Sequence, residues 1–205
     1  IDEDTSLTLE LSASDIDGDD LTFSASDGNS DIVVDGNVLT ITPPENHNNL
    51  DLGGELITVN VSDGTVVVTT TFTLYINPVN DAPSLDDLSD GETDEDTDFV
   101  LELNGADVDG DDLTFLASVN NGSASIDGTT LTVSPADNYN GDIVVNVIAS
   151  DGQASASGSF TLTVNPVNDV PEITAILDQT IDEDTSLTLE LSASDIDGDD
   201  LTFSA

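Results

Sequence analysis

The chain has 205 residues, with 34 Asp and 10 Glu but no Lys or Arg, and its formal net charge is -44. Nucleic acids and anionic membrane surfaces bind proteins through Lys and Arg, so this composition excludes both as partners. Membrane insertion is excluded as well, because no apolar run approaches the ~20 residues that cross a bilayer. Like charges at this density repel one another. We therefore expect a chain that is folded with cations bound and loosened without them.

Internal repetition dominates the sequence. Residues 1–25 are identical to residues 181–205, and a weaker copy of the same stretch begins at Thr93. The segment Pro78-Val79-Asn80-Asp81 returns as Pro166-Val167-Asn168-Asp169. The structural unit is therefore about 90 residues long.

This repetition predicts three repeats. The first covers residues 1–83 and has an incomplete first strand, the second covers 84–171, and 172–205 is the N-terminal part of a third. The first repeat is longer than the second by about four residues near Leu50–Gly53. We expect the parent chain to continue the same pattern on both sides.

Alternating apolar and polar residues predict strands, and no stretch has helical periodicity. In the first repeat the predicted strands are Leu7–Leu11, Leu21–Ser26, Asp31–Val34, Val38–Thr42, Leu56–Val61 and Val66–Ile76. In the last of these, the even-numbered residues face one side of the strand and the odd-numbered residues the other. Turn pairs such as Asp35-Gly36 and Asp63-Gly64 separate the strands. Short strands with frequent turns predict an all-β fold of tandem immunoglobulin-like sandwiches.

One acidic stretch occurs three times, at Asp15–Phe23, Asp107–Phe115 and Asp195–Phe203, and each copy places four carboxylates around one glycine. Because the chain has no Lys or Arg, the neutralising charge must come from solution. A hard divalent cation with oxygen ligands, Ca²⁺ above all, fits this requirement. The alternative is that the Asp-rich turns only form an acidic, salt-adapted surface.

Three motifs in a fixed order resemble the bacterial cadherin-like tandem repeats of large calcium-dependent surface adhesins. They are Asp15-Ile16-Asp17-Gly18, Ser62-Asp63-Gly64 and Pro78-Val79-Asn80-Asp81-Ala82-Pro83. The resemblance covers both full repeats and the partial third. It implies cadherin-like β-sandwiches arranged end to end, with Ca²⁺ bound at the joints between repeats. The linkers differ from the animal cadherin pattern at Pro78, Pro166, Ala82 and Val170, which implies fewer ions per joint.

The resemblance also implies which residues bind the ions. The joint after the first repeat would use Glu3, Asn80, Asp81, Asp107, Asp109 and Asp151. The next joint would use Glu95, Asn168, Asp169, Asp195 and Asp197, with a last ligand beyond residue 205. The remaining set, Asp15, Asp17 and Asp63, would face a repeat that precedes Ile1.

The implied function is mechanical: a calcium-rigidified extender or stalk in a bacterial cell-surface or secreted adhesin, whose partners are neighbouring repeats of the same chain. An enzyme is not expected, because His47 is the only His and no Lys, Arg or Cys can activate a nucleophile. A second hypothesis is that the repeats bind carbohydrate or identical repeats, with Tyr75 and Tyr139 as candidate stacking residues. A third is self-assembly into an extracellular filament.

Overall fold

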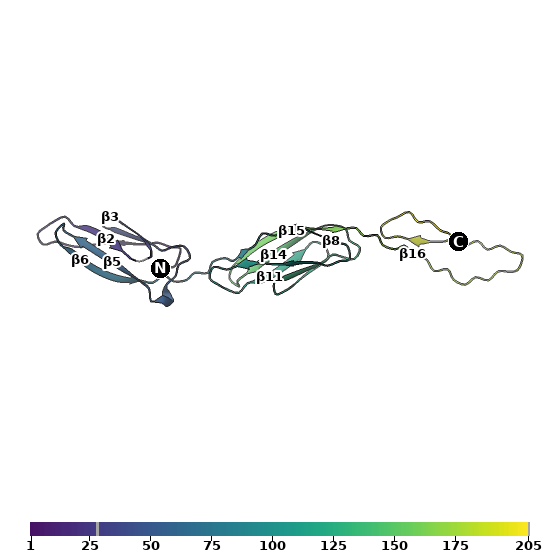
Figure 1. The fold of residues 1–205 in the computed structure, drawn as a ribbon, viewed down its shortest axis with the longest axis horizontal. Helices are drawn as coiled ribbons and strands as arrows, with labels where there is room; N and C mark the ends of the chain where they lie inside the picture. The colour runs from purple at the N-terminus through teal and green to yellow at the C-terminus, as the bar shows by residue number, and fades with distance from the viewer. Residues whose placement is uncertain (28, 205) are drawn as a thin grey trace. The chain divides into compact units, whose positions relative to one another are not determined.

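The computed structural model describes residues 1–27 and 29–204, which form two compact units, unit 1 ending at Asp81 and unit 2 beginning at Ala82. Strands dominate both units (Figure 1). Among the described residues, no helix is long and apolar enough to span a membrane. The predicted all-β fold of immunoglobulin-like sandwiches is confirmed.

Unit 1 is a sandwich of two antiparallel sheets. Its elements are, in chain order, β1 (Leu7–Glu10), β2 (Thr22–Ser26), β3 (Asp31–Asp35), β4 (Val38–Thr42), the 3-10 helix η1 (Leu50–Leu52), β5 (Glu55–Ser62) and β6 (Val67–Leu74). One sheet has the order β1-β4-β3 and the other β2-β5-β6. The alternating pattern places the inward side chains of β4, β5 and β6 between the sheets, where Leu39, Ile41, Ile57 and Leu74 form a buried core.

Periodicity did not predict two features of unit 1. The extra residues near Leu50–Gly53 form η1, which periodicity did not predict. The buried Asn49 holds this loop: its Oδ1 accepts a hydrogen bond from the Ile76 amide at 2.9 Å, and its Nδ2 donates to the Leu74 carbonyl at 3.2 Å. In addition, Val66 and Val68 are 57% and 62% exposed, so the even-numbered face of the last strand is covered only along its second half.

Unit 2 has the same two-sheet core. Its elements are β7 (Ser84–Leu85), β8 (Gly91–Asp94), β9 (Phe99–Glu102), β10 (Gly105–Ala106), β11 (Thr114–Val119), β12 (Ser123–Asp127), β13 (Thr130–Ser134), β14 (Gly141–Ser150), β15 (Ser155–Asn165), β16 (Glu172–Ile173) and β17 (Ala193–Ser194). One sheet has the order β12-β13-β9, and the other is β11-β14-β15-β8, with β8 parallel to β15 (Figure 1). Leu131, Val145, Phe160 and Leu162 are buried between them.

The last strands fix one acidic residue at the base of each unit. Glu95 follows β8, and its amide donates to the Asn165 carbonyl at 2.9 Å. In unit 1, Glu3 follows a parallel bridge between Asp2 and Asn77, and its amide donates to the Asn77 carbonyl at 3.0 Å. Both Glu side chains are buried, at 2% exposure for Glu3 and 4% for Glu95.

Candidate metal centre

The acidic loop adopts the same conformation in all three copies. In the first copy the Asp15 Oδ1 accepts hydrogen bonds from the amides of Asp17 at 2.8 Å and Gly18 at 2.9 Å. Gly18 has φ +82°, a left-handed conformation that costs other residues about 1–2 kcal/mol. The first Asp of each loop therefore uses one carboxylate oxygen to shape the turn and leaves the other available as a ligand.

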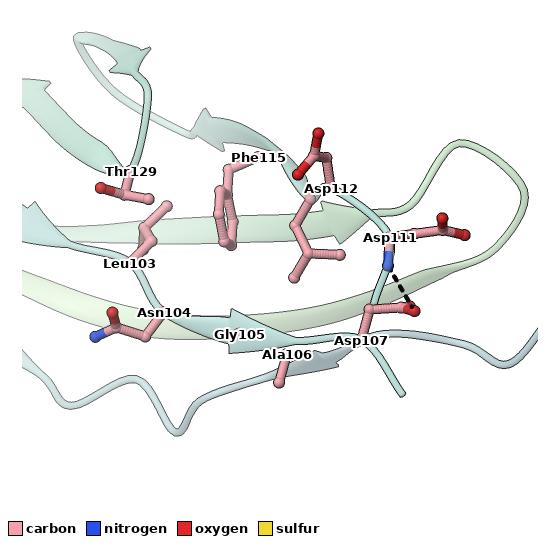
Figure 2. A pocket seen from close by; sticks show the side chains of 10 residues that line it. Leu103, Asn104, Gly105, Ala106, Asp107, Asp111, Asp112, Phe115 and Thr129 are labelled. Atoms are coloured by element: carbon pink, nitrogen blue, oxygen red, sulfur yellow. Dashed lines mark hydrogen bonds between the residues drawn. The ribbon is translucent and has the colours of Figure 1, made fainter. Parts of the chain in front are cut away.

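The later copies repeat the contact made by the amide of the second Asp. The Asp107 Oδ1 accepts from the Asp109 amide at 2.9 Å, and the Asp195 Oδ1 accepts from the Asp197 amide at 3.1 Å. The Asp107 Oδ2 is buried and has no hydrogen-bond partner. A hollow of about 300 Å³ adjoins this loop, and Figure 2 shows the Asp111 amide bonded to Asp107 while the Asp111 carboxylate turns away from it.

A second acidic turn lies beside the first in unit 1. The Asp63 Oδ1 accepts hydrogen bonds from the amides of Val66 at 2.7 Å and Thr65 at 2.6 Å. These two bonds stabilise the carboxylate and lower the pKa of Asp63 below its usual value. Asp15 and Asp63 line one hollow of about 100 Å³, so two of the three predicted ligands of this set lie together. In unit 2 the Asp151 Oδ1 makes the equivalent bonds to the amides of Gln153 and Ala154, both at 2.6 Å.

The base of each unit presents a matching set of groups. The Glu3 Oε1 accepts a hydrogen bond from the Val79 amide at 2.6 Å, and Glu95 accepts one from the Val167 amide. In the linker that follows, the Asn80 Nδ2 donates to the Asp81 carbonyl at 2.7 Å. The Asn168 Nδ2 donates to the Asp169 carbonyl at 2.6 Å, which leaves the Asn168 amide oxygen free to serve as a ligand.

Among the described residues, unit 2 brings three carboxylates into one cluster. Glu95, Asp169 and Asp197 each place a carboxylate oxygen within 4.8 Å of the others. The Asp169 amide donates to the Asp197 Oδ2 at 2.7 Å, which joins the linker to the acidic loop. Asp195 and Asp169 also line a common hollow of about 390 Å³. The structure thus gathers Glu95, Asp169 and Asp197 from separate stretches of the sequence.

The electrostatics of this cluster favour a bound cation. The Asp169 Oδ2 is buried without a hydrogen-bond partner. Burial, followed by the charges of Asp197, Asp96, Glu95 and Asp195, raises the pKa of Asp169 above its usual value. A buried carboxylate without a donor is unfavourable unless a positive charge compensates it. Because the donors are oxygens and the cluster contains no His or Cys, they suit a hard cation such as Ca²⁺ better than Zn²⁺ or Cu²⁺.

The charge of Asp96 acts on the cluster, although sequence reasoning did not select this residue. It belongs to the repeated Asp-Glu-Asp-Thr motif, which was the available signal. Its Oδ1 accepts a hydrogen bond from the Asn138 amide at 2.9 Å, as Asp4 does from Asn46 at 2.8 Å in unit 1. Asp96 therefore fixes the neighbouring loop and adds negative charge beside Asp169.

His47 and Tyr139, considered above for catalysis and for carbohydrate binding, contact neighbouring residues of their own units. The His47 Nε2 lies 2.9 Å from the Glu55 Oε1, which also interacts with Asn29. Burial by itself raises the pKa of Glu55, but the hydrogen bonds from Ser30, Asn29 and His47 together lower it. Tyr139 packs against the core of unit 2, and its hydroxyl donates to the Asp142 carbonyl at 3.0 Å. Tyr75 is 50% exposed.

Comparisons with known proteins identify the two units. Residues 79–165 match the family model of the cadherin-like domain, and residues 1–76 match that of the bacterial Ig domain. Each of these two segments is therefore similar to an Ig-like domain family, bacterial Ig for residues 1–76 and cadherin-like for residues 79–165. Such domains are adhesin-type modules with structural or adhesive roles, typically outside the cell. The predicted relation to bacterial cadherin-like repeats is confirmed.

Solved structures also resemble the chain. The EC1-2 fragment of human protocadherin-24 is 16% identical, with a TM-score of 0.47, over 78% of this chain and 88% of that one. An endo-fucoidan hydrolase of glycoside hydrolase family 107 is 22% identical, with a TM-score of 0.34, over 78% of this chain. The chain spans about a quarter of that enzyme's length, at 26%. No curated protein matches the chain.

Proposed function

We propose that this chain is a calcium-rigidified extender of a bacterial cell-surface or secreted adhesin. The observation that carries the proposal is the cluster of Glu95, Asp169 and Asp197, with its buried and unpartnered Asp169 oxygen, in a chain without Lys or Arg. Glu95 belongs to the base of one repeat, Asp169 to the linker and Asp197 to the loop of the next repeat. One ion bound by all three would join two repeats.

The ligand set suits Ca²⁺. This ion takes 6–8 oxygen ligands, and both carboxylate oxygens of Glu95 or Asp169 can contribute. Asp195, the Asn168 amide oxygen, backbone carbonyls and water supply further ligands. Without the ion, repulsion among the carboxylates would loosen the linker. With the ion bound, its attraction for each carboxylate outweighs their mutual repulsion. The angle between the repeats is then fixed.

The other acidic loops and linkers carry the same kinds of oxygen ligand for Ca²⁺. The base of unit 1 presents Glu3, Asn80 and Asp81, and the loops of unit 2 present Asp107, Asp109 and Asp151. Asp15, Asp17 and Asp63 form the corresponding loop set of unit 1. We include all of these residues in the proposal as Ca²⁺ ligands, each half-set being completed by a neighbouring repeat.

Small-angle X-ray scattering with Ca²⁺ and with a chelator, at equal ionic strength, tests this function. We expect a narrower distance distribution in Ca²⁺ for the parent chain and a smaller change for Asp197→Asn. Asp87→Asn removes the same charge from an exposed position outside the cluster and should respond as the parent does. Identical scattering of the parent chain in both conditions would refute the rigidifying role.

A further inference from the structure

Three positions that hold core side chains in unit 2 hold polar side chains in unit 1. The sequence repeat and the strand registers align the two sets. In unit 2 the residues are the fully buried Ile143 and, packed against the core, Val119 and Tyr139. Their counterparts in unit 1 are Glu55, Asp27 and His47. Burying polar groups is unfavourable unless they find partners, so this combined exchange indicates that the three act together.

In unit 1 the exchanged residues gather around Asn29. The His47 Nε2 lies 2.9 Å from the Glu55 Oε1 and 2.9 Å from the Asn29 Nδ2. The Asn29 Nδ2 in turn lies 3.3 Å from the same Glu55 oxygen. His47 precedes η1, Glu55 begins β5 and Asn29 lies between β2 and β3, so separate parts of the chain meet here. We call His47, Glu55 and Asn29 the histidine cluster.

Hydrogen bonds among its members do not satisfy the histidine cluster. The His47 Nε2 has one bonding direction in the ring plane, and it either donates or accepts there. As a donor to Glu55, it brings its N–H against the amino group of Asn29. As an acceptor from Asn29, it brings its lone pair against the carboxylate oxygen. Turning the Asn29 amide end for end keeps its shape and replaces the amino group by the amide oxygen. Lone pairs of an imidazole, a carboxylate and an amide then face one point, which requires a cation there.

Neighbouring groups hold the members of the cluster in place, as they do around bound metals. The Ser30 hydroxyl donates to the Glu55 Oε2 at 2.8 Å, which leaves Oε1 for the cluster. The Asp27 Oδ1 accepts a hydrogen bond from the Asn29 backbone amide at 3.0 Å. Burial raises the pKa of Glu55, but the hydrogen bonds outweigh it, so the carboxylate is ionised. The His47 and Glu55 side chains are 27% and 12% exposed, which leaves access for an ion and for water ligands.

We propose that the histidine cluster binds one divalent transition-metal ion, such as Zn²⁺, through the His47 Nε2, the Glu55 Oε1 and the Asn29 amide oxygen. Ligand atoms at Zn²⁺ bonding distances lie about 3.0–3.4 Å from one another, close to the spacing within the cluster. Water completes the coordination. A site with an imidazole nitrogen suits Zn²⁺, whereas the all-oxygen cluster at Asp169 suits Ca²⁺. The bound ion links the β2–β3 turn, the loop before η1 and the start of β5, and so stabilises unit 1.

His47 is the only His, so NMR of a chain with ¹⁵N-labelled His observes this site alone. Ca²⁺ in saturating excess first fills the carboxylate clusters, and Zn²⁺ is then titrated at neutral pH. The His47 Nε2 resonance should shift in a single saturable step. Glu55→Gln should bind Zn²⁺ at least about tenfold more weakly. Glu10→Gln, which removes the same charge from an exposed position of β1, should bind Zn²⁺ as the parent does.

Thermal unfolding gives a second readout of the same site. With Ca²⁺ present throughout, Zn²⁺ should raise the melting temperature of unit 1 in the parent chain, because the ion binds the folded unit. The melting temperature of unit 1 in His47→Tyr should not respond to Zn²⁺. This variant carries the residue that unit 2 has at the corresponding position, Tyr139.

Three results would overturn the proposal. One is a His47 resonance that responds to pH but not to Zn²⁺, because a proton then supplies the positive charge. Another is equal Zn²⁺ affinity in Glu55→Gln and the parent, because the imidazole then binds the metal alone. The third is a melting temperature of unit 1 that saturating Zn²⁺ leaves unchanged. Should Glu55→Gln fail to fold, Asn29→Ala, at an exposed position, replaces it and should also weaken binding at least about tenfold; parent-like affinity there would contradict the site.

Discussion

Glu95→Gln gives the sharpest test of the metal centre, because it removes a charge while preserving the shape of the side chain. The Gln amide oxygen can still accept the hydrogen bond from the Val167 amide. The fold of unit 2 should therefore survive. What is lost is one of the three carboxylates whose oxygens lie within 4.8 Å of one another.

The expected loss of affinity follows from electrostatics. A divalent ion about 2.4 Å from a carboxylate oxygen gains about 3 kcal/mol even with the screening of bulk water. That energy corresponds to roughly a hundredfold in Kd. The neutral amide oxygen retains part of the interaction, so we expect Ca²⁺ to bind Glu95→Gln between about tenfold and a hundredfold more weakly.

Isothermal titration calorimetry of Ca²⁺ into the chelator-treated chain measures this loss. Asp87→Asn, which removes an equal charge outside the cluster, should bind Ca²⁺ as the parent does. Circular dichroism should show that Glu95→Gln has the same strand content as the parent. Parent-like affinity in a folded Glu95→Gln would refute the assignment of this cluster as the ion site.

Further predictions concern pH, turn geometry and the loop of unit 1. Burial and neighbouring carboxylates raise the pKa of Asp169, so the folded state holds its proton more tightly than the unfolded state. In chelator the melting temperature of unit 2 should therefore rise as the pH falls toward that pKa, whereas Ca²⁺ affinity should fall because protons compete for the ligand. Gly110→Ala should cost about 1–2 kcal/mol in chemical denaturation, since Gly110 has φ +83°; an unchanged midpoint would contradict this. Asn49→Ala leaves the Ile76 amide and the Leu74 carbonyl without their partner and should destabilise unit 1 by about 2 kcal/mol, with the unit 2 transition unchanged.

Much of the fold could be predicted from the sequence. Strands that bury one face between two sheets alternate apolar and polar residues, and this alternation is a strong signal. β4 covers the predicted residues Val38–Thr42, and the other predicted strands of unit 1 are found within two residues at each end. Alternation did not reveal how much of the even-numbered face of the last strand would be buried. Val66 and Val68 share the even-numbered face with the buried Leu74 and Ile76, and yet they remain exposed. η1 depends on the tertiary contacts of Asn49, which periodicity does not report.

The sequence predicted an acidic cation site and its main carboxylates, but not every residue or atom that shapes it. Repetition and the cadherin resemblance selected Glu95, Asp169 and Asp197, which lie far apart in the sequence. The role of Asp96 depends on the fold, because its hydrogen bond to Asn138 joins residues 42 positions apart. The buried Asp169 oxygen could not be foreseen either, since burial of a single atom is set by packing.

The most direct test of the account is a crystal structure of the chain grown with Ca²⁺, with anomalous scattering used to locate the ions. We predict an anomalous peak about 2.3–2.6 Å from oxygens of Glu95, Asp169 and Asp197. A structure in which these three carboxylates lie together around no ion, at a Ca²⁺ concentration that saturates binding in solution, would contradict the central claim.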